Sequence, residues 1–170
     1  MFKEKYVITF AGAVGSSKTP IAYYLSWKLN LPIFNNDSIR TEVVEEEGDF
    51  SEMEYLKRRD DRIHQIVNSG MSFIYDASVD RIWKDKKIFW RKELGYNVFI
   101  ISLDLSKELL VKLYNAKKYN ETLLRIDELI EDHHIFLDQC DSDVGLHISD
   151  QNFDDRLEIS YRSVLHWLER

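Results

Sequence analysis

The stretch Gly12-Ala13-Val14-Gly15-Ser16-Ser17-Lys18-Thr19 decides the fold of this chain. It follows a β-branched and aromatic run, Tyr6–Ala11, which predicts a buried strand. It precedes Thr19–Leu29, where large apolar residues recur at every fourth position, as along one face of a helix. The motif G-x-x-x-x-G-K-[S/T] requires this context, because the loop amides and the helix N-terminus then surround a phosphate group.

The motif predicts a role in nucleotide binding for the whole loop: Gly12, Ala13, Val14, Gly15, Ser16, Ser17, Lys18 and Thr19. We expect the Lys18 ammonium to reach the β- and γ-phosphates and the Thr19 hydroxyl to bind Mg²⁺. Serine stands at position 17, where the motif has glycine. If this position requires a positive φ, the Cβ of Ser17 would weaken phosphate binding. The alternative is a turn of small residues followed by a chance Lys-Thr pair.

Four further apolar runs predict strands at Pro32–Phe34, Ser72–Tyr75, Asn97–Leu103 and Val144–Ile148. Helical patterns lie between them, at Ser51–Asn68, Asp80–Leu94, Ser106–Lys117, Thr122–Leu137 and Phe153–Leu168. The strands are continuously apolar, which is typical of parallel strands covered on both faces. The alternation of strands and helices predicts the α/β class, with one domain over residues 1–170. Its architecture would be a three-layer α/β/α sandwich around a five-stranded parallel sheet, a P-loop NTPase fold.

The amino-acid composition limits the classes of function that this chain can have. The formal net charge is −7 and the isoelectric point is about 5.3, so the surface lacks the excess of cations that extended nucleic-acid binding requires. Cys140 is the only cysteine, which suits a reducing compartment. No apolar run approaches the length of a membrane span, and the N-terminus has no secretory leader pattern. We therefore expect a cytoplasmic protein with no membrane partner.

A second cluster of candidate residues, Asn35-Asn36-Asp37-Ser38-Ile39-Arg40, follows the second predicted strand. Ligands of an open parallel sheet bind beyond the carboxyl ends of its strands, so Asp37 is expected on the same rim as the phosphate loop. A carboxylate there can take the proton of an attacking hydroxyl, and Arg40, one helical turn on, can bind a substrate phosphate. The alternative is structural: Asp37 would cap a helix that begins at Ser38.

These motifs, with the strand that ends in Phe73-Ile74-Tyr75-Asp76, resemble the polynucleotide-kinase-like group of P-loop kinases, which includes zeta-toxin-like kinases. The resemblance implies the strand order 2-3-1-4-5. It also implies that Asp37 is the catalytic base and that Arg40 binds the acceptor. Lys18 would stabilise the transferred phosphoryl group, and Asp76 would hold Mg²⁺ together with Thr19.

The resemblance further implies a helical lid over about residues 106–140, from which Lys117 and Arg125 would reach the nucleotide. The basic residues of this stretch are mainly lysines, which bind phosphate as point charges and not as a planar fork. We expect Arg81 to lie at the surface. Other notable residues are interpreted as structural: Arg58, Arg59 and Arg62 on a solvated helix face, His133 and His134 without metal-ligand spacing, and Trp27, Trp83, Trp90 and Trp167 packed between helices and sheet.

Two functions remain open from the sequence. The first is an ATP- and Mg²⁺-dependent kinase that phosphorylates a hydroxyl of a nucleotide, a nucleic-acid end or another small molecule. The second is a nucleotide-binding module with little transfer activity that acts through a partner. Asp37 and Arg40 favour the kinase, whereas Ser17 and the lysine-rich lid favour the module. Plain nucleotide hydrolysis is a third hypothesis, but the sequence offers no dedicated water-positioning group.

Overall fold

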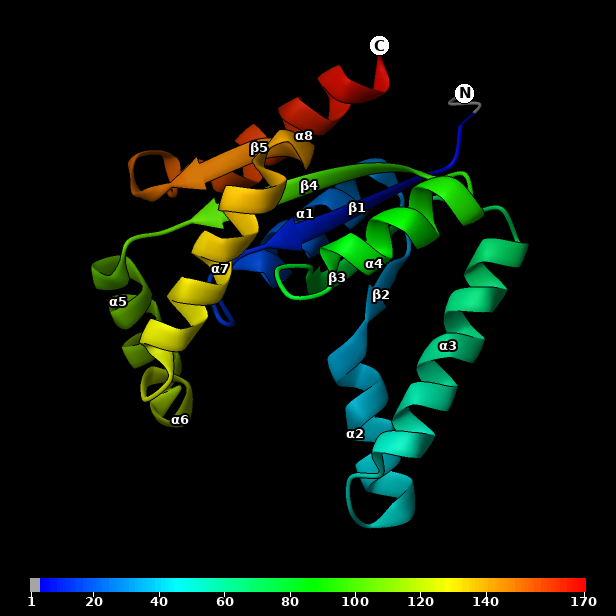
Figure 1. Ribbon diagram of the computed structural model, residues 1–170, viewed down its shortest axis with the longest axis horizontal. Helices are drawn as coiled ribbons and strands as arrows, with labels where there is room; N and C mark the ends of the chain where they lie inside the picture. The colour runs from blue at the N-terminus through cyan, green and yellow to red at the C-terminus, as the bar shows by residue number, and fades with distance from the viewer. Residues whose placement is uncertain (1–3) are drawn as a thin grey trace.

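A five-stranded parallel sheet with the order β2-β3-β1-β4-β5 lies at the centre of the protein (Figure 1). The computed structural model describes residues 4–170. The strands are β1 Tyr6–Ala11, β2 Ile33–Asn35, β3 Phe73–Ser78, β4 Asn97–Asp104 and β5 Val144–Ser149. The parallel direction and the order of the strands confirm the predicted sheet.

Helices cover both faces of the sheet, so the three-layer architecture is also confirmed (Figure 1). The core on one face includes residues of α1 (Lys18–Leu29), α5 (Lys107–Lys117) and α8 (Arg156–Leu168). The core on the other face includes residues of α2 (Asn36–Glu47), α3 (Glu52–Asn68), α4 (Trp83–Lys87) and α7 (Ile126–Cys140). The short helix α6 (Asn120–Leu123) follows α5.

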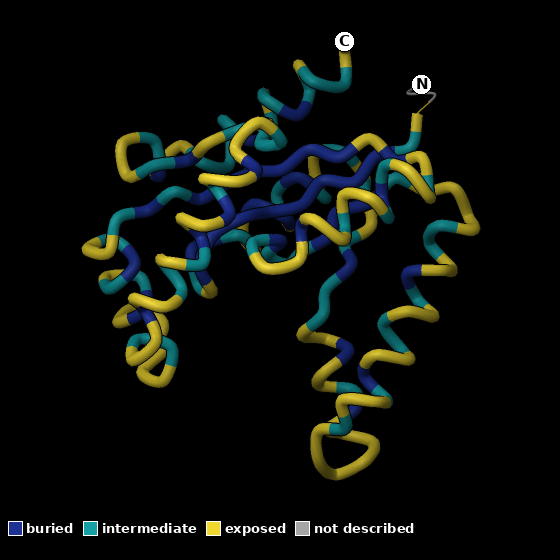
Figure 2. Tube along the Cα trace, viewed as in Figure 1, coloured by how far each residue is buried: buried dark blue, intermediate teal, exposed yellow. Residues whose placement is uncertain are grey.

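The strand side chains alternate between two separate cores. Ile8 and Phe10 of β1 belong to the core with α1 and α8, whereas Val7 and Ala11 belong to the core with α3 and α4. Every residue of β1 is buried, and Figure 2 shows the central strands as a continuous buried band. Burial on both faces explains why these strands are apolar without alternation.

The chain between β3 and β4 differs from the predicted helix Asp80–Leu94. Helix α4 begins three residues later, at Trp83, and Ile88–Glu93 continues it as a π-helix. Asp80 lies in the turn before α4, where its carboxylate accepts a hydrogen bond from the Gly12 amide, with N to Oδ1 at 3.0 Å. Two other boundaries also differ: β3 continues through Asp76 to Ser78, and the predicted helix Thr122–Leu137 is divided into α6 and α7.

Helices α2 and α3 form an arm that projects from the sheet (Figure 1). Two ion pairs join them: Arg62 contacts Glu42, and Arg58 lies 2.7 Å from Glu46. Arg58 and Arg62 therefore join α3 to α2, whereas Arg59 pairs with its exposed neighbour Asp60. The tip of the arm, around the turn at Gly48, is exposed (Figure 2).

The prediction that all four tryptophans pack between helices and sheet is wrong for Trp27. Trp83 and Trp90 are buried, and the Trp167 ring packs at 5.1 Å from the Phe99 ring. Trp27 is 75% exposed, with its neighbours Tyr24 and Lys28 beside it. It lies on the outer face of α1, because Ile21, Ala22 and Leu25 occupy the inner face. Within residues 4–170, no helix combines the length and the apolar character that a bilayer span requires.

Candidate active site

The loop between β1 and α1 has three residues with positive φ: Gly12 (124°), Gly15 (75°) and Ser17 (83°). A Cβ on Gly15 would lie 2.8 Å from Tyr114 Cε1, so glycine is required both by the backbone and by the close approach of α5. Ser17 is in the left-handed conformation with a Cβ in place. The condition under which Ser17 strains the loop is therefore met.

Lys18 folds back over its own loop. Its ammonium donates to the Gly12 carbonyl at 2.9 Å, to the Ala13 carbonyl and to Ser16 Oγ at 3.3 Å. Burial lowers the Lys18 pKa to about 8, even though the charges of Asp80 and Asp76 favour the ammonium. The loop thus holds a half-buried cation whose charge is neutralised only in part, as an anion-binding site requires.

Thr19, Asp76 and Asn35 meet at the carboxyl ends of β2 and β3. The Thr19 hydroxyl donates to Asp76 Oδ2 at 3.0 Å, and Asn35 Nδ2 donates to the same oxygen at 3.1 Å. Burial raises the Asp76 pKa, while the hydrogen bond from Thr19 and the charge of Lys18 partly oppose that rise. The structure therefore brings together the two residues that the sequence assigned to a metal.

Asn35, and not Asp37, caps helix α2. The Asn35 side chain accepts hydrogen bonds from the Asp37 and Ser38 amides, at 2.7 and 3.3 Å. The helix begins at Asn36, so the alternative in which Asp37 caps a helix from Ser38 is wrong. The Asp37 side chain therefore has no capping role.

Arg40 lies over aromatic rings of the arm. Its guanidinium carbon is 4.6 Å from the centre of the Tyr55 ring and 5.0 Å from that of Phe50. Among residues 4–170, no carboxylate forms an ion pair with Arg40. The rings orient a cation whose hydrogen-bonding edge stays available for an anion.

A cavity of about 550 Å³ joins these groups. Its lining comes from the phosphate loop, from the carboxyl ends of β2 and β3, and from the arm, which supplies Arg40 and Tyr55. Its lining contains Val14, Gly15, Ser17, Lys18, Thr19, Asn35, Asn36, Asp37, Arg40, Asp76 and Lys117. Residues that the sequence assigned separately to nucleotide, metal and acceptor thus share one cavity.

Helix α5 covers the phosphate loop. Lys117 donates to the Gly15 carbonyl at 2.6 Å, and the Tyr114 hydroxyl donates to the Val14 carbonyl. Arg125 does not reach the cavity, because both Nε and Nη2 of its guanidinium bind the Glu128 carboxylate. Arg81 is exposed as expected, and it pairs with Glu128 and Asp132 on α7.

The predicted lid over about 106–140 includes a helix that belongs to the body of the domain. Phe136 and Cys140 of α7 are buried in the core beneath α4. The cover over the loop comes from Tyr114, Lys117 and Tyr119, at the end of α5 and just after it. Movement of the lid remains a prediction, and α5 with α6 is the part that lies against the loop.

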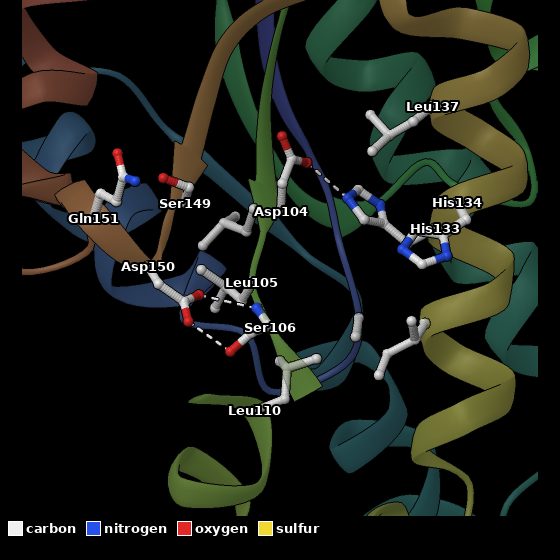
Figure 3. A pocket seen from close by; sticks show the side chains of 13 residues that line it. Asp104, Leu105, Ser106, Leu110, His133, His134, Leu137, Ser149, Asp150 and Gln151 are labelled. Atoms are coloured by element: carbon white, nitrogen blue, oxygen red, sulfur yellow. Dashed lines mark hydrogen bonds and ion pairs between the residues drawn. The ribbon is translucent and has the colours of Figure 1, made fainter. Parts of the chain in front are cut away.

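A second cavity of about 480 Å³ lies between α7 and the ends of β4 and β5 (Figure 3). The side chains of Asp104 and His133 both line it and are joined by a 2.8 Å hydrogen bond. Asp150 closes another side, where it accepts hydrogen bonds from the Ser106 amide and hydroxyl. Ala13 is the residue of the phosphate loop that lines this cavity.

A buried polar chain connects this second cavity to the phosphate loop. His133 contacts Asp104 through Nε2 and Asp80 through Nδ1, at 2.8 and 3.2 Å, and Asp80 in turn accepts from the Gly12 amide. Burial alone would lower the His133 pKa, but the hydrogen bonds to Asp104 and Asp80 raise it to about 9. Sequence reasoning missed Asp80 and assigned His133 no polar partner. An aspartate four residues after Asp76 was the only indication available.

The site offers hard oxygen donors for a magnesium ion. Thr19 Oγ1 and the Asp76 carboxylate lie within hydrogen-bond distance, and both oxygen types suit Mg²⁺, which keeps most of its waters. Residues 4–170 contain no group of three or more His, Cys, Asp or Glu side chains arranged to hold a metal by themselves. The donor set therefore fits an ion held jointly by the protein, water and nucleotide phosphates.

Comparisons with protein-family models and with curated proteins give no match. Solved structures match over nearly the whole chain. A gluconokinase from Sinorhizobium meliloti is 14% identical, with a TM-score of 0.64 over 99% of this chain and 95% of that one. APS kinase from Mycobacterium tuberculosis, solved with AMPPNP and APS, is 15% identical, with a TM-score of 0.62 over 95% and 98%. A shikimate kinase from Bacteroides thetaiotaomicron is 14% identical, with a TM-score of 0.58 over 97% and 99%.

At these identities the likeness shows the fold, which is that of the P-loop kinases. The matched kinases differ from one another in the acceptors that their names state, so the fold does not select an acceptor. The narrower polynucleotide-kinase-like group stays a prediction.

Proposed function

We propose that this protein is an ATP- and Mg²⁺-dependent kinase that phosphorylates a hydroxyl group of a small molecule, a nucleotide or a nucleic-acid end. The observation that carries the proposal is the shared cavity, which Asp37 and Arg40 line together with the phosphate loop. Asp37 does not cap its helix, and Arg40 has no carboxylate partner within residues 4–170. A pure binding loop would need neither group.

In the proposed reaction the acceptor oxygen attacks the γ-phosphorus of ATP. The bond between that phosphorus and the β–γ bridging oxygen breaks, ADP leaves, and the hydroxyl proton moves to the Asp37 carboxylate. Lys18 leaves the carbonyls of Gly12 and Ala13 and binds the phosphate oxygens instead. Mg²⁺, held by Thr19 and through Asp76, would supply positive charge to the β- and γ-phosphates.

The environment of Arg40 favours an acceptor that contains an anionic group. A guanidinium that stacks on Tyr55 and Phe50 presents its donors edge-on, in the geometry that binds phosphate or carboxylate. The chain has an excess of acidic over basic residues, 30 against 23, which argues against long nucleic acid as the acceptor. A screen of hydroxyl compounds with γ-labelled ATP would identify the acceptor.

Nucleotide binding is tested by Lys18→Ala. MgATP at about 100 times its Kd should raise the free energy of unfolding of the wild type by about 2.7 kcal/mol, and its melting temperature accordingly. Lys18→Ala should abolish this rise without unfolding the free protein, while Lys57→Ala, at an exposed lysine of α3, should leave it unchanged. Equal responses of the Lys18→Ala variant and the wild type would refute the assignment.

ATP binding should also take up protons. The Lys18 pKa is about 8 in the free protein, and phosphate charge favours the ammonium, so this pKa rises in the complex. A group whose pKa rises on binding takes up protons between the two values, and the affinity therefore falls as the pH rises through about 8. Calorimetry in buffers of different ionisation enthalpy measures this uptake. Binding heats that are independent of the buffer from about pH 7 to about pH 9 would contradict it.

The alternative function is a nucleotide-binding module that acts through a partner. The observation that favours it is the cover over the loop: Lys117 and Tyr114 bind loop carbonyls, and Lys18 does so too. Such a module would bind MgATP, yet it would transfer no label to any hydroxyl compound. The same screen therefore separates the two functions.

A further inference from the structure

Arg156 differs from most arginines of this acidic chain. Most of them pair with a carboxylate: Arg58, Arg59, Arg62, Arg81, Arg91, Arg125 and Arg162. Within residues 4–170, Arg156 has no such partner, although acidic residues outnumber basic ones. A half-buried guanidinium without a counter-ion is costly unless an anion joins it.

The position of Arg156 is fixed by three contacts at the start of α8. Its Nε donates to Ser17 Oγ at 2.9 Å, and its Nη1 donates to the Phe153 carbonyl at 2.9 Å. Its guanidinium carbon lies 4.2 Å from the centre of the Phe153 ring. Arginine has five N–H donors, and these contacts use two of them. The remaining donors stay available beside the phosphate loop.

Ser17 provides the anchor for this arginine. The residue is 5% exposed and adopts φ 83° and ψ 25°, a left-handed conformation that is unfavourable for a residue other than glycine. Glycine would avoid this cost, but it would not provide a hydroxyl. The hydrogen bond from Arg156 is the interaction that the Ser17 side chain adds. Serine, in place of the glycine of the motif, therefore supplies a hydrogen-bond acceptor for Arg156.

Arg156 also lies close to another cation at the loop. Burial lowers the Lys117 pKa, and the positive charge of Arg156 lowers it further. Lys117 binds the Gly15 carbonyl, and Arg156 binds the side chain of Ser17, two residues on. Lys117 of α5 and Arg156 of α8 thus contact nearby residues of the loop. The repulsion between these two cations favours binding of an anion there.

We propose that Ser17 holds Arg156 at the phosphate loop so that the free edge of its guanidinium binds the phosphate chain of the nucleotide. This inference rests on the proposed nucleotide binding. Arg156 would then provide, from α8, the planar fork that Lys117 of the cover cannot form. Arg156 is the phosphate-binding residue of this pair, and Ser17 positions it.

Calorimetric titration with MgATP, adenosine and inorganic tripolyphosphate tests the proposal. Arg156→Gln should weaken binding of MgATP and of tripolyphosphate by about 10–100-fold, the value of one hydrogen-bonded charge contact. Binding of adenosine should not change. Arg156→Lys, which keeps the charge but not the fork, should lose less. Arg162→Gln, also on α8 but paired with Glu158, is the matched control and should bind as the wild type does.

Ser17→Ala separates positioning from phosphate contact. It keeps a Cβ at the left-handed position and removes only the hydroxyl, so it should weaken tripolyphosphate binding less than Arg156→Gln does. Because both changes affect one contact, the double variant Ser17→Ala/Arg156→Gln should bind no more weakly than Arg156→Gln alone. Additive losses would show that Ser17 does not act through Arg156.

The outcomes also distinguish this inference from the proposed function. A wild type that binds MgATP, with the expected loss in Arg156→Gln, but transfers no label to any hydroxyl compound would refute the kinase and leave the Arg156 inference standing. Wild-type affinity of Arg156→Gln for tripolyphosphate would overturn the inference while nucleotide binding stands. An equal loss for adenosine and MgATP would also overturn it, because Arg156 would then act on the nucleoside or on the shape of the loop. Binding of neither ligand by the wild type would overturn both proposals.

Discussion

Asp37→Asn is expected to lower kcat about 10²–10⁴-fold, the usual contribution of a general base. The substitution preserves the shape of the side chain and removes the charge that takes up the acceptor proton. The Asn35 side chain, and not that of Asp37, caps α2, so the helix should keep its start and its stability. Affinity for MgATP should hardly change, because the loss arises in the chemical step. Turnover of an acceptor found in the label-transfer screen measures the effect.

Two further variants make this result specific. Glu45→Gln removes an exposed carboxylate from the same helix and should retain wild-type turnover. Arg40→Ala should mainly raise the acceptor KM, because it removes an acceptor-side contact and leaves the phosphate loop intact. If Asp37→Asn phosphorylates the acceptor at the wild-type rate, the base lies elsewhere and the mechanism is wrong.

The fold could be predicted because its determinants are local. Tyr6–Ala11 and Asn97–Leu103 are apolar throughout, and the loop Gly12–Thr19 marks the turn from strand to helix. The sequence did not indicate the full length of α2, because only Ile39 and Val43 of that helix are buried. Its other residues are mostly polar, and hydrophobic periodicity does not detect a helix that projects from the sheet.

The parts of the site that could be predicted lie at the carboxyl ends of neighbouring strands. Thr19, Asp37 and Asp76 each follow or end a recognisable strand, and topology alone brings them together. Arg156 could not be predicted, since it is 139 residues from its partner Ser17. It is the first residue of α8, and the hydrophobic pattern of that helix indicates only which residues face the core. Asp80 and His133 were missed for the same reason: their contacts are tertiary and leave no periodic pattern in the sequence.

His133→Ala is expected to lower the free energy of unfolding by about 3 kcal/mol at neutral pH, at the lower end of the cost of breaking a buried ion pair. The His133 and Asp80 side chains are 8% and 7% exposed, so removing the imidazole leaves the Asp80 charge buried with the Gly12 amide as its donor. The lower value applies because Asp104 keeps Ser102 and His147 as donors. Chemical denaturation of the free protein measures the loss, and His134→Ala, an exposed neighbour, is the matched control.

The pH dependence of this loss identifies its cause. The folded-state pKa of His133, about 9, is raised above the ordinary value of 6.5. A base whose pKa is raised by folding contributes stability that is complete below its unfolded pKa and is lost as the pH rises through its folded pKa. The difference between wild type and His133→Ala should therefore shrink from about pH 7 to about pH 10. The lowered pKa of Lys18 acts in the opposite direction, but it is present in both proteins and cancels in the difference. A difference that stays constant over this range would show that His133 contributes packing against Phe136 and not charge.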